Sequence, residues 1–125
     1  MTHQFQHGIE SCNACAQACD VLLREDATQV SIQAKESVSM LLIDCAEICR
    51  LTSSYLSRGS EMAKAACSLC AEVCVATARA CEKHQEPSYQ RIAQACMFCA
   101  EDCERTARGW LGRKIDEPTG GPYAG

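Results

Sequence analysis

The chain has 125 residues, enough for one domain with its own core but short for two. Aromatic residues make up only 5% of the chain, a composition that favours helices over sheets. The net charge of -4, without a cluster of basic residues, argues against nucleic acid as a partner. No apolar run approaches the roughly 20 residues of a membrane span. The first residues also lack a signal-peptide pattern, so we expect a cytoplasmic protein with no membrane contact.

Turn signals divide the chain into four predicted helices. Gly59 and Ser60 indicate one break, because glycine suits the end of a helix and serine can cap the next one. Pro87 indicates another break, since proline ends a helix but can begin one. The first predicted helix spans about 3–24, and the second begins between 28 and 37 and ends near 57. The third runs from 60 to 82 or 84, and the fourth spans 87–111.

Four helices joined by short turns predict an all-α fold, an antiparallel up-down-up-down four-helix bundle. We expect residues 1–111 to form this bundle. Residues 112–125 are rich in glycine and proline, so we expect a flexible C-terminal tail there.

The most distinctive feature is the phrase Cys-Ala-x-x-Cys, which occurs four times, beginning at Cys15, Cys45, Cys70 and Cys99. Three of the copies follow another cysteine by three residues, so only one of the twelve cysteines, Cys81, lies outside the pattern. Spacings of three, four and seven place side chains on one face of an α-helix. Each copy therefore predicts a line of sulfur atoms along the inner face of one helix.

These lines of cysteines are predicted to lie in layers across the bundle. In two neighbouring antiparallel helices, the numbers of two residues at the same height add up to a constant total. For every neighbouring helix pair, the totals of the facing cysteines agree within one residue. Layers about 5 Å apart follow from the helical rise. The predicted layers are Cys12, Cys49, Cys67 and Cys103; then Cys15, Cys45, Cys70 and Cys99; then Cys19, Cys74 and Cys96 with Leu41.

The two ends of this sulfur column are predicted to differ. Towards the end of the first helix, Leu22, Val38, Ile92 and Thr77 or Ala78 form an apolar plug, with Cys81 beyond it. At the opposite end the small residues Gly8, Ser53, Ala63 and Ala107 predict a more open mouth. His3, His7 and Met62 lie near this mouth as candidate ligands for an incoming metal, and Phe5, Leu56 and Trp110 can partly cover it.

Thiolates are soft ligands that favour Cu(I), Zn(II) and iron–sulfur clusters. Cu(I) takes two or three sulfurs, and a thiolate can bridge two ions, so a column of thiols predicts multiple Cu(I) ions, on the order of ten per chain. One monovalent ion per thiolate also leaves the buried core nearly neutral. A zinc-binding thiolate buffer is the alternative, with two tetrahedral sites that use eight thiols. Iron–sulfur binding, thiol redox sensing and simple core filling also remain open.

Disulfides are disfavoured, because neighbouring cysteines on one helix have nearly parallel Cβ vectors and packed helices lie about 8–10 Å apart. A nucleophile and base pair, a phosphate loop and an organised carboxylate dyad are all missing from the sequence. We therefore do not expect an enzyme.

The chain resembles the cysteine-rich four-helix-bundle copper-storage proteins over nearly all of residues 3–111. The resemblance is carried by the Cys-x-x-Cys-Ala-x-x-Cys stripes and by three further stretches, Asp44 to Arg50, Arg58 to Glu61 and Cys81 to His84. The resemblance implies a cytosolic Cu(I) store, often a tetramer. We also expect exchange of copper with a copper chaperone or small thiols. It implies metal ligands at Cys12, Cys15, Cys19, Cys45, Cys49, Cys67, Cys70, Cys74, Cys96, Cys99 and Cys103, and it also matches Cys81. The longer members carry cysteines where this chain has its apolar plug, so we expect a lower capacity.

Overall fold

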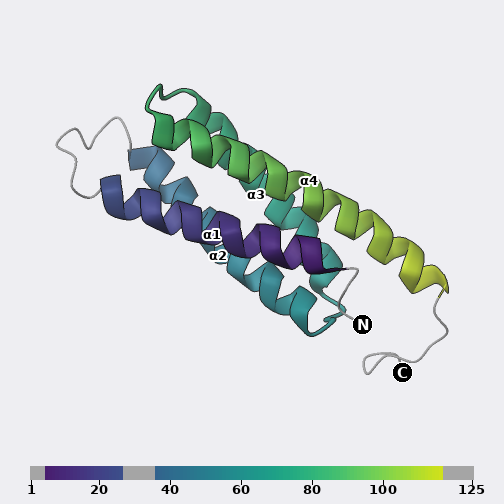
Figure 1. Cartoon of the computed structure of the whole chain (residues 1–125). Helices are drawn as coiled ribbons and strands as arrows, with labels where there is room; N and C mark the ends of the chain where they lie inside the picture. Colours follow the sequence, from purple (N-terminus) through teal and green to yellow (C-terminus); the bar gives the residue numbers. More distant parts are fainter. Residues whose placement is uncertain (1–4, 27–35, 117–125) are drawn as a thin grey trace.

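The computed structural model describes residues 5–26 and 36–116, with side chains placed for 5–25 and 38–109. These residues form four helices: α1 (Gln6–Asp26), α2 (Glu36–Ser57), α3 (Ala63–Glu82) and α4 (Pro87–Asp116). Each helix packs against its two neighbours in a closed ring, with α1 against α2 and α4, and α3 against α2 and α4 (Figure 1). The predicted all-α antiparallel bundle is therefore confirmed.

The helices bury residues that alternate at spacings of three and four, the pattern of a coiled-coil interface. On α1 and the residue before it the buried series is Phe5, Gly8, Cys12, Cys15, Cys19 and Leu22. On α2 it is Val38, Leu42, Cys45, Cys49, Thr52 and Leu56. On α3 it is Ala63, Cys67, Cys70, Cys74, Thr77 and Cys81, and on α4 it is Tyr89, Ile92, Cys96, Cys99 and Cys103. The middle of each series is sulfur, and the large buried side chains lie towards the ends of α1 and α2 and at the start of α4.

The turn between α2 and α3 forms as the sequence predicts, with one difference. Gly59 has a φ of 65°, and its N–H donates to the Leu56 carbonyl at 3.2 Å while the Ser60 N–H donates to the Tyr55 carbonyl at 2.9 Å. These two bonds form a Schellman motif, which needs a residue of positive φ. Ser60 does not occupy the N-cap position of α3, which belongs to Met62; its hydroxyl instead accepts the Met62 N–H at 3.0 Å.

Two other predictions about the helices need correction. α4 ends at Asp116 and not near Leu111, so residues 112–116 are helical and do not belong to a tail. The predicted helix end ignored the good helix formers that follow Gly112, and one glycine costs a helix only about 1 kcal/mol. Leu41 is only half-buried, whereas Leu42 is fully buried and continues the inner face of α2. Residues 117–125 lie outside the described residues.

Candidate metal centre

The twelve cysteines form a dry column of free thiols. Every one is buried, with at most 1% of its surface exposed, and none forms a disulfide. Sulfur atoms from different helices lie in contact: Cys12 and Cys103 are 3.7 Å apart, as are Cys15 and Cys45. The column also crosses the bundle diagonally, because Cys45 on α2 lies 3.9 Å from Cys96 on α4. The α-helical spacing of the sequence thus produces one continuous cluster.

Three groups of four thiols have all their sulfur atoms within 4.8 Å of one another. Numbered from the N-terminal end of α1, the first quartet is Cys12, Cys70, Cys99 and Cys103; the second is Cys15, Cys49, Cys74 and Cys99; the third is Cys15, Cys19, Cys45 and Cys96. Cys99 belongs to the first and second quartets, and Cys15 to the second and third. The quartets therefore form a linked series and not three separate sites.

These quartets correct the predicted layers. The constant totals identified the facing helices, but the structure pairs Cys49 with Cys70 at 3.7 Å and with Cys74 at 3.9 Å, where Cys67 was expected. Cys12 similarly lies between Cys99 at 3.8 Å and Cys103 at 3.7 Å. Side chains of packed helices fit between, and not opposite, the side chains of the facing helix. Flat four-membered layers are therefore replaced by interlocked groups.

Two cysteines lie outside the quartets. Cys67 is fully buried, and its contact with Cys103 contributes to the raised pKa of that thiol. Cys81 is also fully buried, at the opposite end of the column. The residues predicted as an apolar plug are buried. Leu22, Val38, Ala78 and Ile92 belong to the same core cluster as the cysteines, and Thr77 is buried as well.

At the predicted open mouth, the inward-facing residues that the structure describes are buried. Gly8, Ser53, Ala63 and Ala107 are small and buried as expected, but Phe5 and Leu56 are buried beside them in the core. A Cβ added to Gly8 would lie 3.1 Å from Leu56 Cδ1, so the glycine permits this close packing. His7 is exposed and Met62 is 57% exposed, so neither reaches the sulfur column. His3 and the side chain of Trp110 lie outside the described residues.

The thiols perturb one another's protonation. The pKa values of the Cys19 and Cys74 thiols are raised above the ordinary value. The largest cause is contact with Cys15, and contacts with other thiols and burial add to it. The pKa of Cys70 is lowered instead, first by Cys103, because neighbouring S–H groups donate to its sulfur and stabilise a thiolate. Seven thiols in all have a raised pKa, so most of the column is protonated at neutral pH: Cys12, Cys19, Cys49, Cys74, Cys96, Cys99 and Cys103. A metal that binds must displace these protons.

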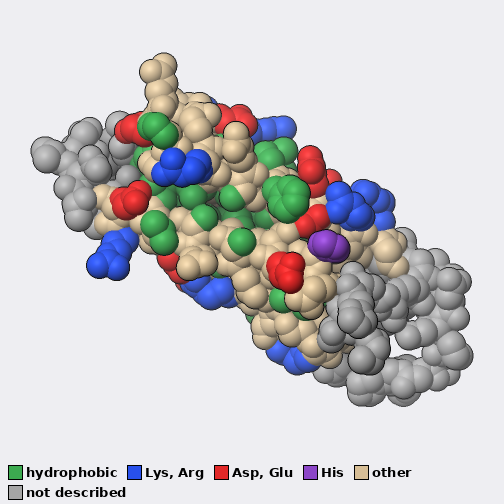
Figure 2. Space-filling model, in the orientation of Figure 1, with side chains coloured by type: hydrophobic (Ala, Val, Ile, Leu, Met, Phe, Trp, Pro, Cys, Tyr) green, Lys and Arg blue, Asp and Glu red, His purple; other side chains and the backbone are tan. Residues whose placement is uncertain are grey.

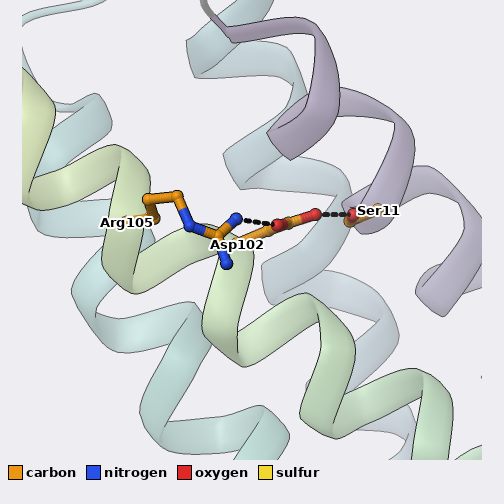
Figure 3. Close-up of polar contacts among 3 residues, drawn as sticks. All are labelled: Ser11, Asp102 and Arg105. Carbon is orange, nitrogen blue, oxygen red and sulfur yellow. Dashed lines mark hydrogen bonds and ion pairs between the residues drawn. The ribbon is translucent and has the colours of Figure 1, made fainter.

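Sequence reasoning missed a polar cluster beside the first quartet. Asp102 on α4 is buried; it accepts a hydrogen bond from the Ser11 hydroxyl on α1 and forms an ion pair with Arg105 at 2.5 Å (Figure 3). The constant totals that place Cys12 opposite Cys103 place Ser11 opposite Glu104 and not Asp102, so they did not predict this bond. On the face shown in Figure 2, acidic and basic side chains are interspersed over the surface.

A sequence profile of the Copper storage protein family (Csp) matches residues 1–108. The chain belongs to the copper storage protein family. The Cu(I)-bound copper storage protein BsCsp3 has a similar structure, with a TM-score of 0.81 and 30% identity over 84% of this chain and 99% of that one. A cytosolic copper storage protein from Streptomyces lividans, solved with five coppers, gives a TM-score of 0.81 and 26% identity over 86% of this chain and 95% of that one.

An uncharacterized cysteine-rich protein of Bacillus subtilis, YhjQ, is 35% identical over 83 residues, which is 66% of this chain and 76% of that protein. The copper storage fold thus agrees with the architecture derived above. No helix in the described part of the chain has the length and apolar character of a membrane span.

Proposed function

We propose that this chain stores Cu(I), with multiple ions bound by thiolates inside the bundle. The observation that supports this most directly is the linked series of three quartets in a column with at most 1% exposure at any cysteine. Soft thiolates match Cu(I), and a dry lumen protects it. Because Cys15 and Cys99 each belong to two quartets, bridging thiolates extend the cluster along the column. The copper named for the related structures supports the same metal.

Charge favours Cu(I) over Zn(II) in this setting. Four thiolates around one Zn(II) leave a net charge of about -2 in a dry core, which is costly, whereas one Cu(I) per thiolate leaves the core neutral. Geometry also limits zinc, because only the first and third quartets share no cysteine. A zinc buffer would therefore hold two ions, and a copper store many more.

Anaerobic addition of Cu(I) to the apo protein, followed by native mass spectrometry, tests the proposal. We expect many ions per chain, on the order of ten, and release of about one proton for each ion. Saturation at one or two Cu(I) ions would overturn storage. Two Zn(II) ions that Cu(I) fails to displace would support the zinc buffer instead, and interhelical disulfides formed under mild peroxide without metal loading would support a redox sensor.

We propose all twelve cysteines as metal ligands, with the ten quartet members forming the main store and Cys67 and Cys81 lying at its two ends. His3, His7 and Met62 are proposed to act during copper uptake. A triple alanine variant is expected to load more slowly than the unaltered chain but to the same capacity, as stopped-flow loading would measure. An unchanged rate would remove these residues from the uptake path.

We further propose a cytoplasmic protein without catalytic activity that exchanges copper with a copper chaperone or small thiols. The related cytosolic protein of Streptomyces lividans supports this location. The resemblance to the copper-storage family favours a tetramer. Phe98 is 63% exposed on α4, next to the partly exposed Met97, and such apolar side chains suit a contact between copies. Sedimentation of the apo protein, compared with a Phe98→Glu variant, tests the assembly; a monomer in both would overturn it.

A further inference from the structure

We propose that Asp102 is a positioning residue for the first quartet, acting through Ser11 to hold α1 and α4 at the separation that metal binding requires. The inference rests on the proposed storage of Cu(I). It begins from a buried carboxylate that the sulfur column does not use: the Asp102 side chain is 7% exposed, although it carries a charge on a bundle filled with cysteine and alanine. A buried carboxylate is retained only where partners compensate for its lost hydration.

Asp102 has two partners of different character. The Ser11 hydroxyl donates to Oδ2 from the neighbouring helix, and Arg105 contacts Oδ1 at 2.5 Å from the same helix (Figure 3). The Arg105 side chain is 64% exposed, so solvent screens its ion pair with Asp102. The hydrogen bond to Ser11 is partly buried and charge-assisted, which makes it the stronger of the two constraints. It is also the contact that joins two helices.

The position of this bond links it to the metal ligands. Ser11 directly precedes Cys12, and Asp102 directly precedes Cys103, while Cys99 lies one helical turn earlier on α4. Cys12 lies 3.7 Å from Cys103 and 3.8 Å from Cys99. All three thiols belong to the first quartet. The bond between Ser11 and Asp102 therefore fixes the helix pair whose separation sets two of the sulfur contacts of that quartet.

Small interior residues make such a constraint necessary. A core of cysteine and alanine provides less apolar contact than leucine or isoleucine would, so packing alone restrains the helix separation weakly. Without the bond between Ser11 and Asp102, the thiols of the two helices could move apart before Cu(I) binds. A quartet that is already held in place loses less conformational freedom when it binds the ion. The second quartet shares only Cys99 with the first, and the third quartet shares no cysteine with it, so the bond acts most directly on the first quartet.

Asp102→Ala and Ser11→Ala remove the bond, and Asp102→Asn keeps an oxygen that accepts from Ser11 while removing the charge. Asp20→Ala is the matched control, because it breaks another ion pair between helices, Arg50 to Asp20 at 2.7 Å, that is about half exposed. Each substitution is made alone and also together with Cys103→Ser, which removes a ligand of the first quartet. Each Cu(I)-loaded protein is then challenged anaerobically with the Cu(I) chelator bathocuproine disulfonate.

When no other residue is changed, we expect Asp102→Ala and Ser11→Ala to lower the affinity for about one third of the bound copper. The decrease should be roughly fivefold, as the loss of one hydrogen bond predicts. Asp20→Ala should retain copper like the unaltered chain. Asp102→Asn keeps the acceptor for Ser11 but loses the charge assistance, so it should retain more copper than Asp102→Ala. In the Cys103→Ser background Asp102→Ala should have no further effect, because the quartet on which it acts is gone. Equal losses in both backgrounds, or failure of Asp102→Asn to rescue, would overturn the positioning role.

Helicity and thermal unfolding of each apo variant separate this role from a general loss of structure. If Asp102→Ala does not fold, Ser11→Ala decides the question, since it leaves Asp102 paired with Arg105. Normal copper retention by a folded Ser11→Ala protein would overturn the inference and leave storage intact. Failure of the unaltered chain to bind multiple Cu(I) ions would instead overturn the proposed function.

Discussion

The two shared cysteines provide the sharpest test of the linked quartets. Cys15 belongs to two of the three quartets, whereas Cys19, one helical turn away on the same helix, belongs to one. Both are buried, with exposures of 1% and 0%, so serine at either position removes one sulfur from a similar environment. The two substitutions therefore differ in the number of quartets that they disrupt.

The expected losses follow from this membership. Cys15→Ser disrupts the second and third quartets and leaves the first intact, so about one third of the tightly held Cu(I) should remain. Cys19→Ser disrupts the third alone and should leave about two thirds. Cys99→Ser, which disrupts the first and second quartets, should resemble Cys15→Ser. Anaerobic Cu(I) loading against a fixed concentration of bathocuproine disulfonate measures the fraction retained.

Native mass spectrometry of the same samples shows whether the remaining copper forms distinct species. Equal losses from Cys15→Ser and Cys19→Ser would refute the reasoning, because they would mean that copper distributes over the thiols without regard to the quartets. A circular dichroism spectrum of each apo variant must match that of the unaltered chain for the comparison to count.

Four further predictions concern the capacity, the pH dependence and the fold. Cys81→Ser, outside the quartets, should change the Cu(I) capacity by at most about one ion, whereas a loss like that of Cys19→Ser in the same assay would place Cys81 in the main store. Because the pKa values of most folded thiols are raised, the folded protein keeps thiol protons that the unfolded chain loses above about pH 8.5. The apo protein should therefore become less stable as the pH rises above this value. Denaturant unfolding at several pH values measures the trend, and a flat profile would contradict it. Copper affinity should rise with pH, about tenfold per unit for each proton displaced, as chelator competition at several pH values measures. Gly59→Ala, at a φ of 65°, should cost the apo protein about 1 kcal/mol in urea unfolding without changing capacity, and no loss would indicate that the turn rearranges.

The sequence by itself determined the helices, their order and the presence of a shared sulfur interior. Helical periodicity is a local property, so the spacing of Cys12, Cys15 and Cys19 was enough to place them on one face of α1. Gly59 and Pro87 similarly fixed two helix boundaries through their own backbone preferences. The constant totals of the cysteine numbers then identified which helices face each other, because residue numbers run in opposite directions along antiparallel neighbours.

Only the tertiary structure decided which sulfur meets which. Cys70 and Cys67 are both on the inner face of α3, and the sequence favoured Cys67 as the partner of Cys49. The structure places Cys70 there, since interdigitated side chains shift each contact by a fraction of a helical turn. The burial of Phe5 and Leu56 and the bond from Ser11 to Asp102 likewise depend on how closely the helices approach. Periodicity determines a face, but the distance and offset between two faces result from the packing of every side chain between them.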